Sequence, residues 1–350
     1  MIKRFSILSA LLVLVALSAT AQDGPQFKQP EGGVPMLTGF VGLGTNFQPD
    51  QQQIQPTISP IVLVPFGDKW LVESELELEG AYTHVSSQPW DHEWDKGVEY
   101  AQIDYLANRY VTVVGGRFLT PFGIFNERLH SGWIRNIQTA PYIASMEMTD
   151  SNGGQLRGAI PVGNFLNINY AAFFSAVVNN SWVGSTRAAG ERVGFFFPKA
   201  RFEIGTSIQR QLQDQHINTY GADITWQSNR MPLDVRGEYV RNRTLGSGYW
   251  LEGAYRMRKV GFLRPLMRKS QADIRFEQFF APSAMSGSSG GMELPDSDAK
   301  RIFAGWSYWI RPDVRANFAY GREFISDGDH NVWTVGLTYR FAFPLGGGKK

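Results

Sequence analysis

Four glutamates at alternate positions form a row of like charges in the first third of the sequence. Glu73, Glu75, Glu77 and Glu79 are separated by one serine and two leucines. Because successive side chains of a β-strand point to opposite faces, this spacing places all four carboxylates on one face. Four aligned charges cannot face lipid, so that face must meet water or bases. The row therefore predicts a strand that lines an aqueous interior.

Charged side chains on other predicted strands fall on the same inward side when aromatic residues are taken to mark the outward side. The acidic ones are Asp104, Glu203, Asp234, Glu238, Glu252, Asp273, Glu277 and Glu323, and the basic ones are Arg117, Arg157, Arg192, Arg201, Arg236, Arg256, Arg275, Arg315 and Arg340. An interior with both signs suits a diffusion pore, since a field across the channel orients dipolar solutes. The alternative is a closed barrel that is filled with salt bridges.

The elements that must position these side chains are strands with one apolar and one polar face. In the last of them, Val332 to Phe341, alternate residues from Trp333 onward are large and apolar, while the other face carries threonines, a glycine and Arg340. Aromatic residues at both ends of the apolar face are typical of a strand that faces lipid between two headgroup layers.

Sixteen strands of this kind are predicted. They cover residues 36–48, 57–64, 69–83, 98–107, 109–118, 154–161, 165–176, 191–197, 200–212, 216–227, 233–242, 248–257, 272–280, 301–310, 314–324 and 332–341. Connections after even-numbered strands are short except for 258–271, whereas those after odd-numbered strands include 84–97, 119–153, 177–190, 281–300 and 325–331. Short connections at one end of the strands and long connections at the other predict an all-β, antiparallel up-and-down transmembrane β-barrel. Barrels of about 16 strands leave an aqueous channel, which argues against a filled interior.

The start of the chain has the pattern of a secretory signal peptide. A basic beginning precedes an apolar run from Ile7 to Leu17, and small residues at Ala19 and Ala21 complete the cleavage pattern. The apolar run is too short to cross a bilayer. The predicted organisation is a signal peptide at 1–21, an extended leader at 22–35, the transmembrane barrel at 36–341 and a tail at 342–350.

Composition narrows the class of protein. The sequence has no cysteine, so a disulfide or a thiolate site is not possible. No apolar run after the signal peptide is long enough for a transmembrane helix. Loss of Lys3 and Arg4 with the signal peptide cancels the formal charge of +2, and nothing in that balance suggests a nucleic-acid partner. Aromatic residues make up 13% and glycines number 37, which fits a bacterial outer-membrane barrel better than a soluble enzyme.

One segment carries a family resemblance. Residues Gly116 to Gly123, GRFLTPFG, resemble the sixteen-stranded phosphate-selective porin family and the wider group of general porins. In that group a similar Gly-basic-Phe run ends a strand and passes into a Pro-Phe-Gly element that opens the long third loop. The resemblance implies a homotrimeric, water-filled channel that this loop narrows. Phosphate selectivity is not implied, because phosphate-binding members rely on basic rows facing the pore and this sequence mixes signs.

The long loop after the fifth strand, residues 119–152, is predicted to fold into the barrel and form its constriction. It opens with Pro121, Phe122 and Gly123, which can redirect the chain sharply. Its apolar residues need a wall to pack on, and its charged residues are expected to meet Arg117 and Arg157 on the flanking strands. The apolar members are Trp133, Ile134, Ile137, Tyr142, Ile143 and Met146, and the charged members are Glu127, Arg128, Arg135 and Glu147. The alternative is a flap over the rim or at a subunit contact.

Two functions fit this sequence. One is an outer-membrane porin for passive diffusion of small hydrophilic solutes or ions; the alternative is a non-conducting barrel that serves as an adhesin or structural anchor. The apolar content of the 119–152 connection favours the porin. The other expected partners are outer-membrane lipid and the barrel-assembly machinery, which would read the segment Trp333 to Phe341. The solute, the ion preference and the oligomeric state are not fixed by the sequence.

Enzymatic and metal-binding roles are disfavoured. The sequence has no Gly-x-Ser-x-Gly motif, and its five histidines fall in or beside predicted extracellular loops. Asp91, His92, Glu93 and Asp95 have ligand types that could bind a divalent ion at the channel mouth. Ordinary surface exposure explains loop histidines more simply, so neither a metal nor a cofactor is predicted.

Overall fold

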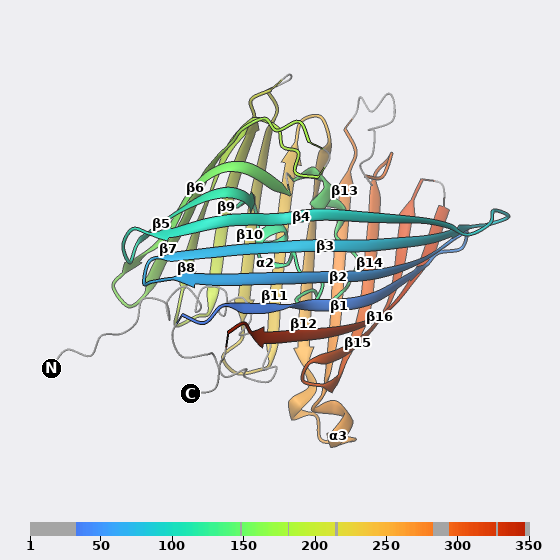
Figure 1. The fold of residues 1–350 in the computed structure, drawn as a ribbon. Coiled ribbons are helices and arrows are strands. Elements are labelled where there is room, and N and C mark those ends of the chain that lie inside the picture. Colours follow the sequence, from blue (N-terminus) through green and yellow to red (C-terminus); the bar gives the residue numbers. More distant parts are fainter. Residues whose placement is uncertain are drawn as a thin grey trace.

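The structure is a computed structural model that describes residues 33–346 apart from 148, 181, 214–215, 283–293 and 327. Its strands form one closed antiparallel barrel in which each strand pairs with its sequence neighbours and β1 pairs with β16. The sixteen strands in this described part are β1 Met36–Phe47, β2 Gln51–Phe66, β3 Trp70–Val85, β4 Asp91–Leu106, β5 Val111–Leu119, β6 Asp150–Val162, β7 Leu166–Ser175, β8 Ala188–Phe197, β9 Phe202–Gln211, β10 Asn218–Gln227, β11 Leu233–Asn242, β12 Gly246–Arg256, β13 Ser270–Phe280, β14 Ala299–Arg311, β15 Val314–Ile325 and β16 Gly328–Pro344. The predicted fold class is confirmed. In Figure 1 the near strands run across the view while the far strands run upright, which is the tilt that closure of a barrel requires.

Pairing of the first and last strands closes the sheet. The register runs from Met36 opposite Pro344 to Phe47 opposite Trp333, so neither terminal strand is left as a free edge. On β16 the odd-numbered residues from Trp333 to Tyr339 are exposed and the even-numbered residues from Val332 to Thr338 are buried. This is the alternation that the sequence predicts for a strand with a lipid face and a lumen face.

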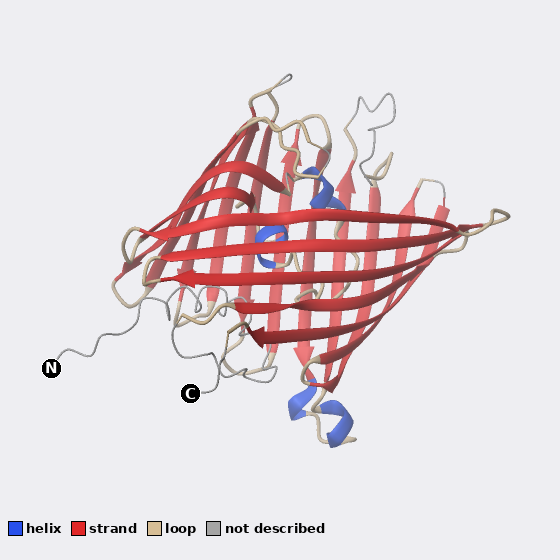
Figure 2. Cartoon of the chain, viewed as in Figure 1, coloured by secondary structure: helices blue, strands red, loops and turns tan. Residues whose placement is uncertain are grey.

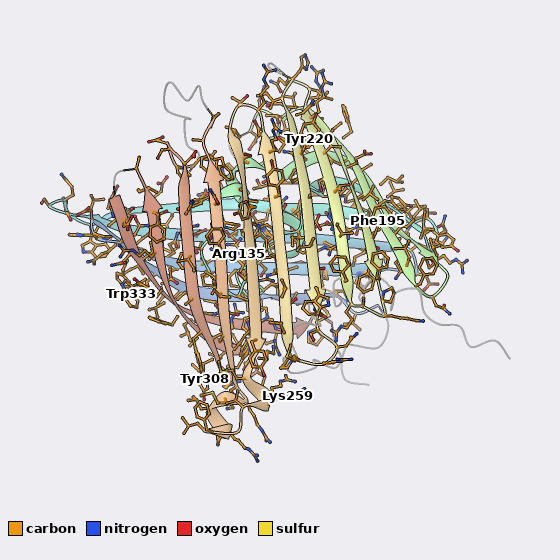
Figure 3. All side chains as sticks on the ribbon, turned by 180° about the vertical axis from the view of Figure 1, so that it is seen from behind. Arg135, Phe195, Tyr220, Lys259, Tyr308 and Trp333 are labelled. Atoms are coloured by element: carbon orange, nitrogen blue, oxygen red, sulfur yellow. The ribbon has the colours of Figure 1, made fainter. Side chains whose placement is uncertain are left out.

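An apolar band surrounds the outside of the barrel. Its middle is aliphatic and well exposed, as at Leu43, Ile58, Leu76, Ile103, Val113, Leu156, Ile204, Leu251, Ile274, Ile302 and Leu337. Aromatic side chains are exposed toward both ends, as at Phe66, Trp70 and Phe165 near the tight turns and Phe174, Tyr220 and Trp333 near the long loops. In Figure 3, Tyr220 and Tyr308 lie toward opposite ends of the barrel. Such a band with aromatic girdles is the surface of a barrel that spans a membrane.

Two predicted loops are wrong because the strands continue through them. β3 and β4 are each 16 residues long and are joined by residues 86–90 only, where the sequence predicts a loop at 84–97. β15 and β16 likewise leave only residues 326–327 between them, where it predicts 325–331. Polar residues in both segments resemble a loop, yet they continue the hairpins beyond the apolar band. Cross-strand ring contacts such as Tyr82 with His92, at 6.1 Å between centroids, hold the first hairpin.

The remaining differences concern the ends and one turn. Residues 257–269 hold two short helices, η2 Met257–Lys259 and α3 Arg264–Met267, visible below the barrel in Figure 2. The predicted signal peptide and almost all of the leader lie outside the described residues. β16 continues to Pro344, three residues into the predicted tail. No helix in the described part of the chain is long and apolar enough to span a membrane.

Candidate functional site: the lumen and its inward loop

The connection between β5 and β6 leaves the wall and enters the lumen. Its two ends are tied together, since the Thr120 N–H donates to the Thr149 carbonyl at 3.1 Å. The Asn126 amide also donates to the carbonyls of Thr120 and Thr149, at 3.0 and 2.6 Å. Between these ends lie α2, Phe125–Arg128, and the 3₁₀ turn η1, Tyr142–Met146. Figure 2 shows helical turns inside the barrel, and Arg135 lies near its centre in Figure 3.

A sharp turn at Gly123 directs the loop against β9 and β11. Gly123 has φ +58°, a left-handed conformation that favours glycine, and its N–H donates to Ser207 Oγ at 3.0 Å. The next two N–H groups, of Ile124 and Phe125, donate to Glu238 Oε2 at 3.3 and 3.1 Å. The Glu238 carboxylate therefore satisfies the free backbone donors at the start of α2.

Apolar side chains of the loop form a core with the inner wall. Phe122 and Ile143 are at most 1% exposed and pack in one cluster with Trp250 and Phe279. Ile137 belongs to a second cluster with Phe303, Ala319 and Val332. These contacts involve strands from β10 to β16, as the packing of Phe122 on Gly221 also shows. The predicted inward loop is confirmed, and a flap over the rim does not account for this burial.

Polar contacts continue along the wall from β12 to β15. Asn136 Nδ2 donates to Glu252 at 2.8 Å, and the Tyr142 N–H donates to Glu277 at 3.1 Å. Arg275 donates to Thr139 Oγ1 at 2.8 Å, and Arg315 donates to the Gly132 carbonyl at 3.0 Å. Tyr142 also hydrogen-bonds Glu323. The strand charges predicted to face inward thus serve as attachment points for the loop.

Trp133 is held between two cations. The guanidinium of Arg315 lies 5.3 Å from its ring centroid and that of Arg340 lies 5.1 Å away. Cation–π attraction is strengthened where water is excluded, and Trp133 is only 5% exposed. This ring joins the middle of the loop to β15 and β16.

The charged residues that the sequence predicts for the inward loop pair with different parts of the protein. Glu127 meets Arg157 of β6 at 2.7 Å, as predicted. Arg128 donates to both oxygens of Glu203 on β9, at 2.8 and 2.7 Å. Arg135 donates to the carbonyls of Leu129 and His130, so it shapes the loop itself.

Glu147 is the loop carboxyl most affected by its surroundings. It is 8% exposed and lies beside the carboxylate of Glu238, with Asp223 nearby. Burial, followed by repulsion from Glu238, raises the pKa of Glu147 well above its usual value. A protonated Glu147 can share its proton with Glu238, which keeps the two carboxyl groups in contact.

Arg117 does not follow the prediction. Strand pairing places it beside Ala101 and Asn152 on the outward side of the wall, at the loop end of β5. Its guanidinium lies 2.6 Å from Asp150 and donates to the carbonyl of Gly184 in the connection 176–187. Gly116, with φ +122°, precedes it, and the residues that follow lead directly into the loop. Its expected meeting with the charges of the inward loop is not seen, although Arg157 does meet them.

The other predicted lumen arginines point inward and are mostly paired. Arg192 lies 2.6 Å from Asp223 and 3.0 Å from Glu203. The remaining contacts join Arg236 to Glu252 at 2.6 Å, Arg275 to Glu277 at 2.7 Å, and Arg256 to Gln271 at 3.3 Å. Arg315 is fully buried.

The glutamate row of β3 faces the lumen on the opposite side. Glu73, Glu77 and Glu79 are half-buried, whereas Glu75 is 2% exposed and accepts a hydrogen bond from Ser59. A β-bulge in β4, where the partner of Glu75 is Tyr100 and the partner of Leu76 is Val98, leaves Glu99 as an extra residue. The Glu99 carboxylate then lies 3.2 Å from Nε2 of His130 in the loop.

His130 and Glu99 were missed as site residues by sequence reasoning. The loop position of His130 suggested exposure, and no periodic pattern reveals a single bulged residue such as Glu99. Burial alone would lower the pKa of His130, but contacts with Glu99 and Glu75 outweigh burial and raise it above the usual value. Ligand atoms of Glu75, Glu77 and His130 lie within 4.8 Å of one another. Among the described residues, Glu75, Glu77 and His130 form the group whose possible metal-ligand atoms lie close together. The predicted set at residues 91–95 does not.

The four possible metal ligands at residues 91–95 do not all lie on one face. Asp91, His92, Glu93 and Asp95 lie on β4, where alternation puts His92 on the face opposite the three carboxylates. His84 and His330 also lie in strands, on β3 and β16. Their predicted placement in loops reflects the two strand extensions described above.

Solved structures with the same architecture were found by comparison. Salmonella typhi OmpF in complex with daunomycin is 14% identical, with a TM-score of 0.59 over 89% of this chain and 99% of that chain. The anion-selective porin from Comamonas acidovorans is 11% identical, with a TM-score of 0.55 over 88% and 99%. The outer-membrane channel DcaP of Acinetobacter baumannii is 12% identical, with a TM-score of 0.53 over 90% and 99%. The fold is that of the bacterial outer-membrane porins. No protein-family model and no curated protein sequence matches the chain.

This likeness confirms the architecture predicted from the sequence. At such identities it carries the fold and not the solute, so the narrower resemblance to phosphate-selective porins stays a prediction. The selectivity must be argued from the residues that face the lumen of this chain.

Proposed function

We propose that the chain is an outer-membrane porin, a water-filled channel for passive diffusion of small hydrophilic solutes or ions. The observation that carries the proposal is the inward loop, which packs on one side of a sixteen-stranded lumen and leaves half-exposed charged side chains on the other. Barrels of this strand number are wide enough for an aqueous channel, and an inward loop sets its width.

The candidate constriction lies between the loop and the walls of β3, β4 and β6. Glu127 and Arg157 are 28% and 30% exposed, and Arg128 is 27% exposed, so water reaches all three. Glu77 and Glu79 line the same region from β3. The pore-lining role is therefore divided: residues on β3 and β6 face the passage, while arginines such as Arg275 hold the loop.

One observation favours a non-conducting barrel that acts as an adhesin or anchor. Arg275 and Arg315 are 2% and 0% exposed, so part of the lumen is filled with side chains. Filling on one side is what attachment of the loop requires, however, and the longest connection is turned inward and not displayed to solvent. The balance of contacts supports the channel.

The proposal includes the surroundings of the barrel. Its apolar band would contact outer-membrane lipid, and β16 would supply the segment read by the barrel-assembly machinery. We also propose a homotrimer, which the size of the detergent-solubilised protein on a native gel or by light scattering would test. Monomeric particles alone would oppose that assembly.

Liposome swelling tests the channel directly. Liposomes that contain the folded protein should swell in small sugars and less quickly as sugar size increases. Replacement of residues 126–146 by a short Gly-Ser linker should raise the size limit, because the linker cannot pack on the β10–β16 wall. A matched control replaces residues 258–268, which lie outside the lumen in the β12–β13 turn, and should leave the limit unchanged. No swelling with correctly folded protein would support the anchor instead.

A further inference from the structure

We propose that the passage left open by the loop selects small cations over anions. The proposal rests on the channel function above and names its preferred solute class. Its basis is a difference between the two sides of the lumen. Most charges on β11 to β14 are paired and covered by the loop, whereas partly exposed carboxylates on β3 and β4 face the lumen with few cationic partners.

The ion pairs of the covered wall contribute little free charge. Arg236 lies 2.6 Å from Glu252, and Arg275 lies 2.7 Å from Glu277. The side chains of Arg275, Glu252 and Glu277 are each at most 2% exposed. Because opposite charges in contact cancel at larger distances, a passing ion meets only weak dipoles from these pairs.

The opposite wall carries carboxyl groups without guanidinium partners. Glu73, Glu77 and Glu79 are half-buried and point inward, and in the described part of the chain no guanidinium lies within ion-pair distance of them. Glu99 is 22% exposed, and the bulge in β4 directs it to the same region, beside the His130 ring. Carboxylates that face water on one side can exchange one hydrated counter-cation for another.

The arginines nearby do not cancel these carboxylates. Arg157 is matched by Glu127, and Arg128 is matched by the buried Glu203, each at 2.7 Å. Two further guanidinium groups act on this side: Arg117, which is matched by Asp150 at 2.6 Å, and Arg135, which donates to the carbonyls of Leu129 and His130. Even with Arg135 and a protonated His130, the partly exposed carboxylates of Glu73, Glu77, Glu79 and Glu99 outnumber these two cations.

The geometry favours cations for two physical reasons. The loop occupies the β10–β16 side of the lumen, so an ion that crosses passes on the side of the β3 row, where salt screens the charges only in part. The apolar barrel wall behind the row has a low dielectric constant and concentrates its field in the water. Potassium, sodium and small organic cations are the solutes that this field attracts, while chloride and carboxylate solutes are repelled.

The sign of the reversal potential in a KCl gradient across a planar bilayer tests the proposal. At pH 8, where exposed carboxylates are charged, the wild-type protein should show the sign that potassium flow gives. In water a unit charge about 7 Å away changes an ion's energy by about one RT, with opposite signs for potassium and chloride, so each carboxylate removed should lower the ratio of potassium to chloride permeability by up to about sevenfold. The double variant Glu77→Gln, Glu79→Gln should therefore move the ratio toward chloride by several-fold, and by up to about fiftyfold where salt does not screen the charges.

A matched control and two contrary outcomes complete the test. Glu191 lies on the outward face of β8 opposite Ile208, so Glu191→Gln removes a charge without changing the lumen. It should leave the permeability ratio unchanged. Current with the opposite sign in the wild type, or an unchanged ratio in the double variant, would overturn cation selection but leave the channel intact. Absence of any current would instead reject the channel function itself.

Discussion

Replacement of Gly123 by alanine should detach the inward loop from β11. The new Cβ would lie 1.4 Å from Oε1 of Glu238, far inside van der Waals contact, so the carboxylate must move. That movement breaks the bonds that Ile124 and Phe125 donate to Oε2 of the same group. Hydrogen bonds to a charged group contribute about 1.5–3 kcal/mol each. The left-handed backbone adds about 1–2 kcal/mol for a residue with a side chain.

A second glycine separates the two effects. Gly163, in the turn between β6 and β7, has φ +59°, and an added Cβ there meets nothing closer than Phe165 at 3.5 Å. Gly163→Ala should therefore cost only the backbone contribution of about 1–2 kcal/mol, with no effect on the lumen. The difference between the two variants, about 3–6 kcal/mol, belongs to the attachment of the loop at Glu238.

Limited trypsin digestion measures that attachment. In the wild type the bonds made by Arg128 and Arg135 should protect the loop from cleavage. In Gly123→Ala the loop should be cut at these residues while the barrel still shows heat-modifiable migration on gels. Protection of Gly123→Ala equal to that of Gly163→Ala would refute the assignment of Glu238 as the anchor.

Two further predictions concern the lipid face and the pH response of the loop. Leu337→Arg, in the middle of the apolar band, should lower the free energy of unfolding by about 2–4 kcal/mol, whereas Phe343→Arg near the strand end should cost about 0–1 kcal/mol; equal costs in urea titrations would contradict the membrane position. Because the folded pKa of Glu147 is raised, its contribution to loop attachment is present at low pH and is lost as pH rises through that pKa. Trypsin sensitivity of the wild-type loop should therefore increase with pH, and Glu147→Gln should remove that increase; an identical pH response in the variant would argue against this role.

Alternation made the barrel predictable from the sequence. Period-two patterns such as that of the glutamate row fix which side of a strand meets water, and closure then follows because an apolar band on every strand leaves no stable free edge. The apolar composition of the 119–152 connection identified Trp133, Tyr142 and Ile143 as residues that need a wall. Strand ends were less certain, because polar residues such as His84 can continue a hairpin into water.

The features that sequence reasoning missed depend on contacts between distant segments. Glu99 faces the lumen because of a bulge that shifts the register by one residue, and strand parity alone would misplace it. His130 is buried only because the loop turns inward at Gly123. Arg117 has the residue type of a lumen charge, yet the parity of β5 directs it to Asp150 on the outer side. Alternation gives the face only where the register is uninterrupted, unlike at Glu99, and where the outward side of the strand is assigned correctly, unlike for β5 and Arg117.

Single-channel recording in a planar bilayer tests the central claim most directly. Purified protein whose loop resists trypsin should produce discrete current steps that grow with salt concentration, and replacement of residues 126–146 by a short linker should enlarge each step. A folded wild-type protein that produces no steps above the bare bilayer would contradict the account.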